Sequence, residues 1–366
     1  MKILMTADGL GGVWNYALEL ARGLQPYGCF VHLVVFGGKL SNTQRVELSL
    51  CENVSCMESD LRLEWMDDPW EDQQVAADLI SEIASEVKPD VIHFNGYALA
   101  SRADWQVPVI IGAHSCVLSW WKAVKREPAP SCLGRYRNEV AAGLAAADAV
   151  VAPTQALLSV LEEIYQVDFH GLVIRNGVDP KPFRACHKVG QILSVGRVWD
   201  EAKNIALLDS IAPEVAWPIL IAGDAASPVS NCRSSFSHVR ILGKLSHWAV
   251  CEEMSRTAIY AAPAWYEPFG LAVLEAALSR CALILADIPT FRELWQDAAM
   301  LIEPSDARCW KAAFSKMLED GAARGSLAEA ARKRALALNR QLMSSSYYHL
   351  YRELAKFQSA EAQSAT

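Results

Sequence analysis

The chain has 366 residues, of which 52% are apolar, so we expect two domains, each with its own core. A formal net charge of −8 excludes a broad basic surface for nucleic acid, because phosphate contacts need clustered Lys and Arg. The ten cysteines show neither CxxC nor Cys/His ligand spacing, so they indicate reduced thiols and no metal site.

The N-terminus, MKILMTADGL, has one lysine and then a short apolar run that ends at Asp8. This pattern predicts a first β-strand and no signal peptide. Nowhere do about 18 uncharged apolar residues run together, so we expect no transmembrane helix. The prediction is a cytoplasmic protein, and peripheral contact with the inner face of the membrane stays open.

The first half of the chain alternates apolar strands with helices. Helices are predicted over VWNYALELARGL, from about Glu71 to Glu86 and near Gly134 to Ala147. The predicted strands are KILMTAD, VHLVVF, DVIHFN, VPVIIGAH and DAVVAP. Near-continuous apolar strands between amphipathic helices predict a parallel sheet covered on both faces.

A cluster of turn-forming residues in RNGVDPKPF predicts a domain boundary near residue 180. Beyond it the pattern restarts, with strands ILSVGR, PILIAGD, VRILGKL, AIYAAP, ALILAD and AAMLIEP. The predicted domains are residues 1–180 and 181–342, and residues 343–366 form a C-terminal helix that packs back on the first domain and frays at its end. Helix is predicted from about Leu327 to Phe357, with breaks near Asn339 and Ser344.

The fold class is therefore α/β: two facing Rossmann-like, doubly wound parallel-sheet domains with an interdomain cleft. In such sheets ligands bind outside the carboxyl ends of the strands. We therefore expect the catalytic and ligand-binding residues at the carboxyl ends of the strands.

After the first strand, Gly9, Gly11 and Gly12 lead into a helix, an arrangement that lets backbone N–H groups approach a phosphate. Trp14 stands where a dinucleotide fingerprint needs glycine, and the second strand ends in Phe36, Gly37 and Gly38 without an acidic residue. These features disfavour NAD binding. A tight turn without a ligand is the alternative.

The segment AAPAWYEPFGLAVLEAALSRCALILAD combines a strand, a loop and a helix. Glu267 lies just before Gly270 opens the helix, so its carboxylate and the helix amides would face a polyol and its pyrophosphate. Glu275 is the single charged residue in GLAVLEAALS, and a buried carboxylate needs hydrogen-bond partners such as a ribose diol. The structural alternatives are a capping role for Glu267 and a bond from Glu275 to a neighbouring loop.

The strand ILSVGR ends with the cation Arg197, and a second cation, Lys203, follows just before a helix. Together they suit a diphosphate and would stabilise a departing nucleoside diphosphate, although ordinary surface charges are the alternative. His114 ends the strand in VPVIIGAHSC, where it would look into the cleft and bind sugar hydroxyls or place a proton. A structural histidine is the alternative there.

The segment LSWWKAVKRE places Trp120 and Trp121 beside Lys122, Lys125 and Arg126. One interpretation is a solvated helix edge with core tryptophans. The other is a surface for an anionic acceptor or the membrane interface.

Taken together, these segments resemble the glycosyltransferase group 1 proteins, the retaining family 4-like enzymes of GT-B fold. The resemblance covers nearly the whole chain and rests on the Gly-rich first turn, IRNGVDPKPF, ILSVGR with a downstream Lys-Asn, LIAGD and YEPFGLAVLEAAL. It implies a nucleotide-sugar donor held by the C-terminal domain, an acceptor held by the N-terminal one, retention of anomeric configuration and no required metal or other cofactor.

The resemblance also assigns roles. Catalytic roles fall on His114, Glu267, Arg197 and Lys203, and donor-binding roles on Gly11, Gly12, Arg197, Lys203, Glu267, Phe269, Gly270, Leu271 and Glu275. Where the family has a small glycine-rich loop, this sequence has ADIPTFREL, which leaves the donor contacts of that loop open. ALSRCA likewise replaces the usual Ala-x-Gly step.

The resulting prediction is a retaining hexosyltransferase that uses a UDP- or GDP-sugar and an unidentified acceptor, either a sugar, a lipid-linked or a small molecule. Its setting would be glycan, exopolysaccharide or glycolipid synthesis, without a nucleic-acid partner. Alternatives are a nucleotide-sugar epimerase of GT-B fold and a non-catalytic sugar-binding protein. A Rossmann dehydrogenase is disfavoured by Trp14. The oligomeric state stays open.

Overall fold

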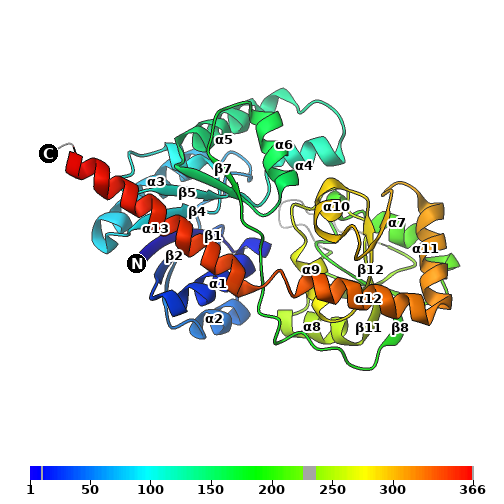
Figure 1. Ribbon diagram of the computed structural model, residues 1–366. Helices are drawn as coiled ribbons and strands as arrows, with labels where there is room; N and C mark the ends of the chain where they lie inside the picture. The colour runs from blue at the N-terminus through cyan, green and yellow to red at the C-terminus, as the bar shows by residue number, and fades with distance from the viewer. Residues whose placement is uncertain (10, 226–235, 365–366) are drawn as a thin grey trace. The chain divides into compact units, whose positions relative to one another are not determined.

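The computed structural model describes residues 1–9, 11–225 and 236–364. The chain forms two compact units (Figure 1). Unit 1 comprises Met1–Lys122, Glu127–Gly177 and Arg340–Thr366, and unit 2 comprises Ala123–Arg126 and Val178–Asn339. The chain passes from unit 1 to unit 2 after Gly177 and returns to unit 1 after Asn339. The boundaries predicted from the sequence were at residues 180 and 342. The end of the tail predicted to fray, residues 365–366, lies outside the described residues.

Unit 1 is built on a parallel sheet that, over the described residues, has seven strands in the order β3-β2-β1-β4-β5-β6-β7. These strands are β1 (Lys2–Asp8), β2 (Phe30–Phe36), β3 (Val54–Glu58), β4 (Val91–Phe94), β5 (Val109–Gly112), β6 (Ala149–Ala152) and β7 (Gly171–Val173). The α-helices in the same part of the chain are α1 (Gly12–Leu24), α2 (Asn42–Ser49), α3 (Trp70–Val87), α4 (Val117–Val124), α5 (Gly134–Ala146) and α6 (Gln155–Tyr165), with short 3-10 helices η1 (Gln25–Tyr27), η2 (Ala98–Ser101) and η3 (Ser131–Leu133).

Both faces of this sheet are buried, as continuous apolar strands predict. Successive side chains of a strand point to opposite faces. Ile3 and Met5 of β1 accordingly join one apolar cluster with residues of α1, while Leu4 joins another with residues of α3.

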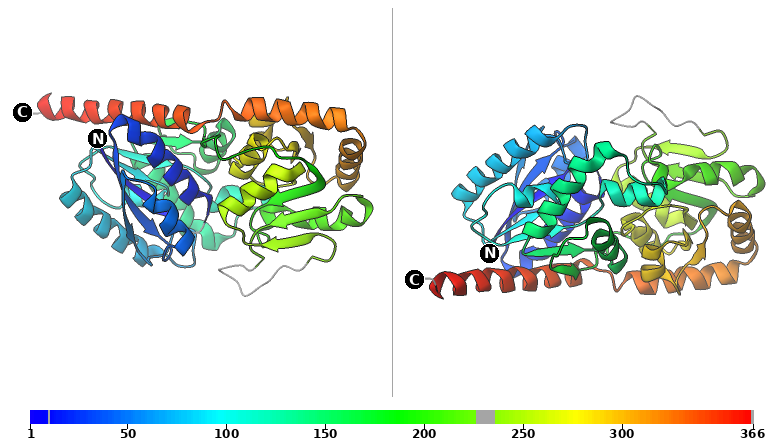
Figure 2. Two further views of the ribbon diagram at one scale, coloured as in Figure 1. Left: turned by 90° about the horizontal axis from the view of Figure 1, so that it is seen from below. Right: turned by 90° about the horizontal axis from the view of Figure 1, so that it is seen from above.

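The C-terminal helix α13 (Arg340–Ser364) packs on the same face of the unit 1 sheet as α1 (Figures 1 and 2). Tyr347 and Tyr351 are buried in the cluster that contains residues of α1. Arg340 pairs with Glu19 of α1, with Nε 2.8 Å from Oε2. The helix continues through Ser344, so the break predicted there is wrong. The Ser344 hydroxyl donates to the Arg340 carbonyl at 2.9 Å instead of interrupting the helix.

Unit 2 has a second parallel sheet, with six strands among the described residues in the order β10-β9-β8-β11-β12-β13. They are β8 (Val189–Val195), β9 (Ile219–Ala222), β10 (Arg240–Gly243), β11 (Thr257–Ala262), β12 (Ala282–Ala286) and β13 (Met300–Ile302). The helices are α7 (Ile205–Ile211), α8 (His247–Arg256), α9 (Leu271–Leu278), α10 (Pro289–Trp295), α11 (Ala307–Glu319) and α12 (Gly321–Ala335), with 3-10 helices η4 (Glu201–Lys203) and η5 (Ala212–Glu214).

The predicted fold class of two doubly wound parallel-sheet domains is confirmed. Among the strands and α-helices of unit 1, the sequence interpretation missed α2, β3, α6 and β7. The break predicted near Asn339 is confirmed, because α12 ends at Ala335 and α13 begins at Arg340, although α12 begins at Gly321 and not near Leu327. No helix in the described part of the chain is long and apolar enough to cross a membrane.

Candidate active site

The loop after β8 carries both predicted phosphate-binding cations. Arg197 directly follows Gly196, and its Nη2 lies 2.8 Å from Oδ2 of Asp200, which is 6% exposed in its side chain. The Asp200 amide donates to the Arg197 carbonyl and the Lys203 amide donates to the Asp200 carbonyl. Buried Asp200 therefore fixes the turn that presents Arg197 and Lys203 together, and the guanidinium, about half exposed, stays accessible.

Lys203 meets the predicted sugar-binding carboxylate across 64 residues of sequence. Its Nζ lies 2.6 Å from Oε2 of Glu267, and both side chains are about one-fifth exposed. The stem of Lys203 passes over Gly196, where an added Cβ would lie 3.2 Å from its Cδ and Cε. The Trp265 amide donates to the Ala202 carbonyl at 2.8 Å and ties the two loops together. The structure thus brings one predicted cation and one predicted carboxylate into a single ion pair.

Helix α9 begins beside this pair. Its N-cap residue Gly270 has φ +89°, a left-handed conformation that favours glycine. The first turn contains no acidic residue and no side chain caps it, as in helix N-termini that bind anions. Phe269 is buried in the core of unit 2, and Leu271 packs against that core. Phe291 belongs to the segment that departs from the family pattern, which forms helix α10 here, and it is fully buried beside Gly270.

Glu275 lies one turn into α9 and is 8% exposed in its side chain. Its Oε1 lies 3.0 Å from Nε2 of His247, the first residue of α8. Hydrogen bonds with the Cys251 sulfur and the Glu275 carboxylate raise the pKa of His247 to about 11, although burial opposes the shift. A cationic imidazole therefore compensates the buried carboxylate.

This pair predicts a pH dependence of stability. The pKa of His247 is raised on folding, so its contribution to stability is complete below about pH 6.5, the ordinary value, and declines as the pH rises toward 11. We expect the unmodified protein to melt at a higher temperature than His247→Gln, and this difference in melting temperature should become smaller as the pH rises from about 6 to about 9. The same substitution at exposed His170 serves as the control. A difference that stays constant or widens would contradict the ion pair.

In unit 1, the predicted glycine-rich turn begins helix α1. Gly11 is the N-cap and Gly12 the first helical residue; both are exposed. A Cβ at Gly11 would meet no heavy atom within 4 Å. The helix has no acidic residue in its first turn and no capping side chain, so its end suits an anion.

His114 lies just beyond the carboxyl end of β5 and is partly buried. Its Nε2 is 2.7 Å from Oδ1 of Asn95, which follows β4. The ring packs edge-on against Tyr16 of α1, with centroids 4.4 Å apart. Burial lowers the pKa of His114 to about 4, so the imidazole is neutral at physiological pH.

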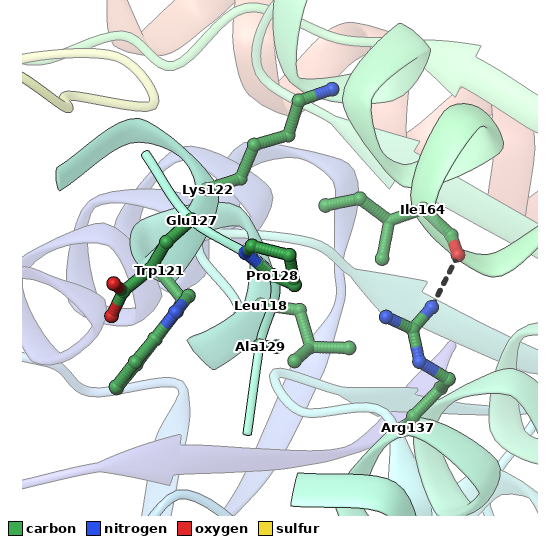
Figure 3. Close-up of a pocket in the computed structure, with 8 residues that line it drawn as sticks. All are labelled: Leu118, Trp121, Lys122, Glu127, Pro128, Ala129, Arg137 and Ile164. Atoms are coloured by element: carbon green, nitrogen blue, oxygen red, sulfur yellow. Dashed lines mark hydrogen bonds between the residues drawn. The ribbon is translucent and has the colours of Figure 1, made fainter. Parts of the chain in front are cut away.

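The aromatic-basic segment predicted as an acceptor or membrane surface borders a pocket of unit 1 (Figure 3). Trp121 and Lys122 line it together with Leu118, Glu127, Pro128, Ala129, Arg137 and Ile164. Lys122 forms an ion pair with Glu163, and Arg137 donates to the Ile164 carbonyl at 2.7 Å. Two of the cations beside the pocket thus already have protein partners.

Among the described residues, no group of three or more His, Cys, Asp or Glu side chains is arranged to hold a metal ion. The described cysteines are free thiols.

The sequence interpretation missed three residues of these two clusters: Asn95, Asp200 and His247. The signal for Asn95 was present, because it ends the predicted strand DVIHFN as His114 ends VPVIIGAH. The signal for His247 is weaker: it lies shortly after the predicted strand VRILGKL, where a helix begins. Asp200 has none beyond its spacing from Arg197.

Two family models match the chain. Residues 10–181 match the one described as Glycosyltransferase Family 4, and residues 190–320 match Glycosyl transferases group 1. The glycogen synthase of Mycobacterium tuberculosis is 26% identical over an alignment of 275 residues that covers 68% of this chain and 64% of that protein. The chain thus spans less than two thirds of this relative.

Solved structures of GT-B glycosyltransferases share the fold. Sucrose-phosphate synthase from Thermosynechococcus elongatus superposes with a TM-score of 0.79 at 17% identity, over 97% of this chain and 99% of that one. The Anabaena protein HepE in complex with UDP and glucose gives 0.74 at 15% identity, over 97% and 100%. At these identities the likeness establishes the fold alone.

Proposed function

Because the chain belongs to the group 1 glycosyltransferases, we propose that it transfers a hexosyl unit from a UDP- or GDP-sugar to a hydroxyl group of its acceptor. The observation that carries this proposal is the cluster of unit 2, in which Lys203 meets Glu267 next to the open end of α9 and Glu275 lies one turn further on. A nucleoside diphosphate sugar offers a partner for each group.

In the proposed complex, Arg197, Lys203 and the α9 amides face the diphosphate. Two cations and a helix N-terminus supply the positive charge that a metal ion provides elsewhere, so we propose that no metal is required. Glu275 accepts hydrogen bonds from the ribose diol, and Glu267 does the same from the sugar. HepE in complex with UDP-glucose supports testing uridine nucleotides first.

The reaction breaks the bond between the anomeric carbon and the diphosphate oxygen and forms one to the acceptor oxygen. The acceptor proton passes to the departing diphosphate. Lys203 and Arg197 stabilise the charge that develops on this leaving group, where fixed donors lower the barrier most. Retention of configuration belongs to the proposal and is tested by the anomeric proton of the product. The acceptor, whether a sugar, a lipid-linked or a small molecule, is proposed to bind unit 1.

A thermal-shift screen against UDP, GDP, ADP, their sugar conjugates and NAD tests this proposal. A ligand present at about 100 times its Kd stabilises the folded state by about 2.7 kcal/mol. We expect one nucleoside diphosphate family to raise the melting temperature by several degrees, and Glu275→Gln to diminish the shift, because the amide keeps only one acceptor oxygen for the ribose diol and loses the negative charge. Glu329→Gln, at a 60% exposed carboxylate of unit 2, is the matched control. A shift by NAD alone, or an undiminished shift in Glu275→Gln, would overturn the proposal.

A further inference from the structure

Asn95 and His114 lie at the carboxyl ends of neighbouring strands. Strand β4 pairs with β1 on one side and β5 on the other, so Asn95 stands between Thr6 of β1 and His114. Three groups from three adjacent strands therefore meet at one edge of the unit 1 sheet.

The orientation of the Asn95 amide follows from its bonds to Thr6. The Asn95 backbone N–H donates to the Thr6 hydroxyl oxygen at 3.0 Å, and Nδ2 donates to the Thr6 carbonyl at 2.7 Å. A carbonyl oxygen only accepts, so the amide nitrogen must face Thr6, and the flipped amide would place two acceptors against each other. Oδ1 consequently faces His114.

This orientation decides which nitrogen of His114 carries the proton. Oδ1 of Asn95 is an acceptor and lies 2.7 Å from Nε2 of His114, so Nε2 must donate. In a neutral imidazole the other nitrogen is then an acceptor. Nδ1 thus offers a lone pair to a hydroxyl hydrogen.

The surroundings keep this ring neutral. The titratable groups that face it are Tyr16 of α1 and His93 of β4. Burial raises the pKa of Tyr16 well above its usual value and lowers that of His93 to about 3, so both are uncharged. No carboxylate hydrogen-bonds to His114 among the described residues.

Gly112 allows the groups to converge. A Cβ at this position would lie 2.6 Å from both Asn95 Oδ1 and His93 Nε2, and 3.3 Å from His114 Nε2. Any larger residue would separate the asparagine from the histidine.

We propose that Asn95 is a positioning residue that holds His114 as the Nε2–H tautomer, so that Nδ1 accepts a hydrogen bond from a substrate hydroxyl. The inference about the tautomer concerns unit 1 alone, and its bearing on catalysis rests on the proposed function. As a fixed acceptor, Nδ1 orients the hydroxyl group that donates to it. In an imidazolium, Nδ1 would carry a proton and could only donate.

Long-range ¹H–¹⁵N NMR of the histidine rings, without nucleotide sugar, tests the tautomer; His114→Gln assigns the signal. We expect neutral His114 with Nε2 protonated at pH 7. In Asn95→Asp, the carboxylate should raise the pKa of His114 by about 1–3 units, since an opposite charge at this range favours the protonated form. Asn53→Asp, at another buried asparagine of unit 1, should leave that pKa unchanged.

The donor-hydrolysis pH profile adds the catalytic readout. In Asn95→Asp, the pH at which kcat falls on the acid side of the profile should rise by as much as the pKa of His114 measured by NMR. A His114 ring protonated on Nδ1 in the unmodified protein, which requires no variant to fold, would overturn the inference. So would an unchanged titration in Asn95→Asp. Absence of any nucleotide-sugar activity would refute the proposed function and leave the tautomer result standing.

Discussion

Replacing Lys203 with alanine is expected to lower kcat by about 100- to 1,000-fold, the loss typical when one group that stabilises developing negative charge is removed. The Lys203 ammonium lies 2.6 Å from Glu267 in a partly buried pair. It therefore holds both the predicted sugar-binding carboxylate and, in the proposed complex, the leaving diphosphate. Steady-state release of the nucleoside diphosphate measures the effect. An arginine at this position should not restore the activity, since a planar guanidinium does not replace a compact ammonium.

Lys311→Ala is the matched control for this prediction. Lys311 pairs with Glu214 in unit 2 at 2.8 Å, and the side chains are 31% and 62% exposed. A surface pair of this kind contributes little, so turnover should not change. Unaltered kinetics in Lys203→Ala would remove Lys203 from the site.

A double variant separates two causes of the Lys203 effect. Without Lys203, the Glu267 carboxylate has no cation and repels a diphosphate, in addition to the lost direct contact. UDP affinity measured in Lys203→Ala, Glu267→Gln and the combination distinguishes them. Recovery in the double variant would indicate repulsion, and no recovery would indicate a direct contact between Lys203 and the diphosphate.

The sequence predicts the sheets well because their strands are continuous apolar runs. Both sheets and most helices follow from this pattern. Two of the missed elements lack the signal: α2 has no buried residue, and β3 is an edge strand with a half-buried pattern. The capping box of Ser41 and Gln44 was available as a start signal for α2.

The candidate site is predicted less completely, because a motif gives residues but not their partners. Glu275 is identifiable as a lone charge in an apolar helix. Its partner His247, 28 residues away, depends on how α8 packs against α9. Asn95 required only the rule that identified His114, whereas the tautomer that it imposes depends on the bonds of Asn95 to Thr6.

Gly223→Ala should reduce both the stability of unit 2 and nucleotide binding. A Cβ at Gly223 would lie 1.8 Å from the Gly196 carbonyl oxygen and 2.8 Å from its carbon, so backbone must move. Overpacking of this kind costs about 1–3 kcal/mol. Gly196 precedes Arg197, and the stem of Lys203 lies over it. The displacement therefore reaches both proposed phosphate ligands.

Chemical denaturation and UDP titration together measure these two effects. The matched control is Gly325→Ala in α12, where an added Cβ would meet nothing within 4 Å and should stabilise the helix by about 0.5–1 kcal/mol. If Gly223→Ala is destabilised and still binds UDP normally, the Gly196 loop does not hold the diphosphate. If Gly223→Ala binds UDP more weakly even well below its melting temperature, the close approach of Gly223 to Gly196 positions Arg197 and Lys203 for the diphosphate.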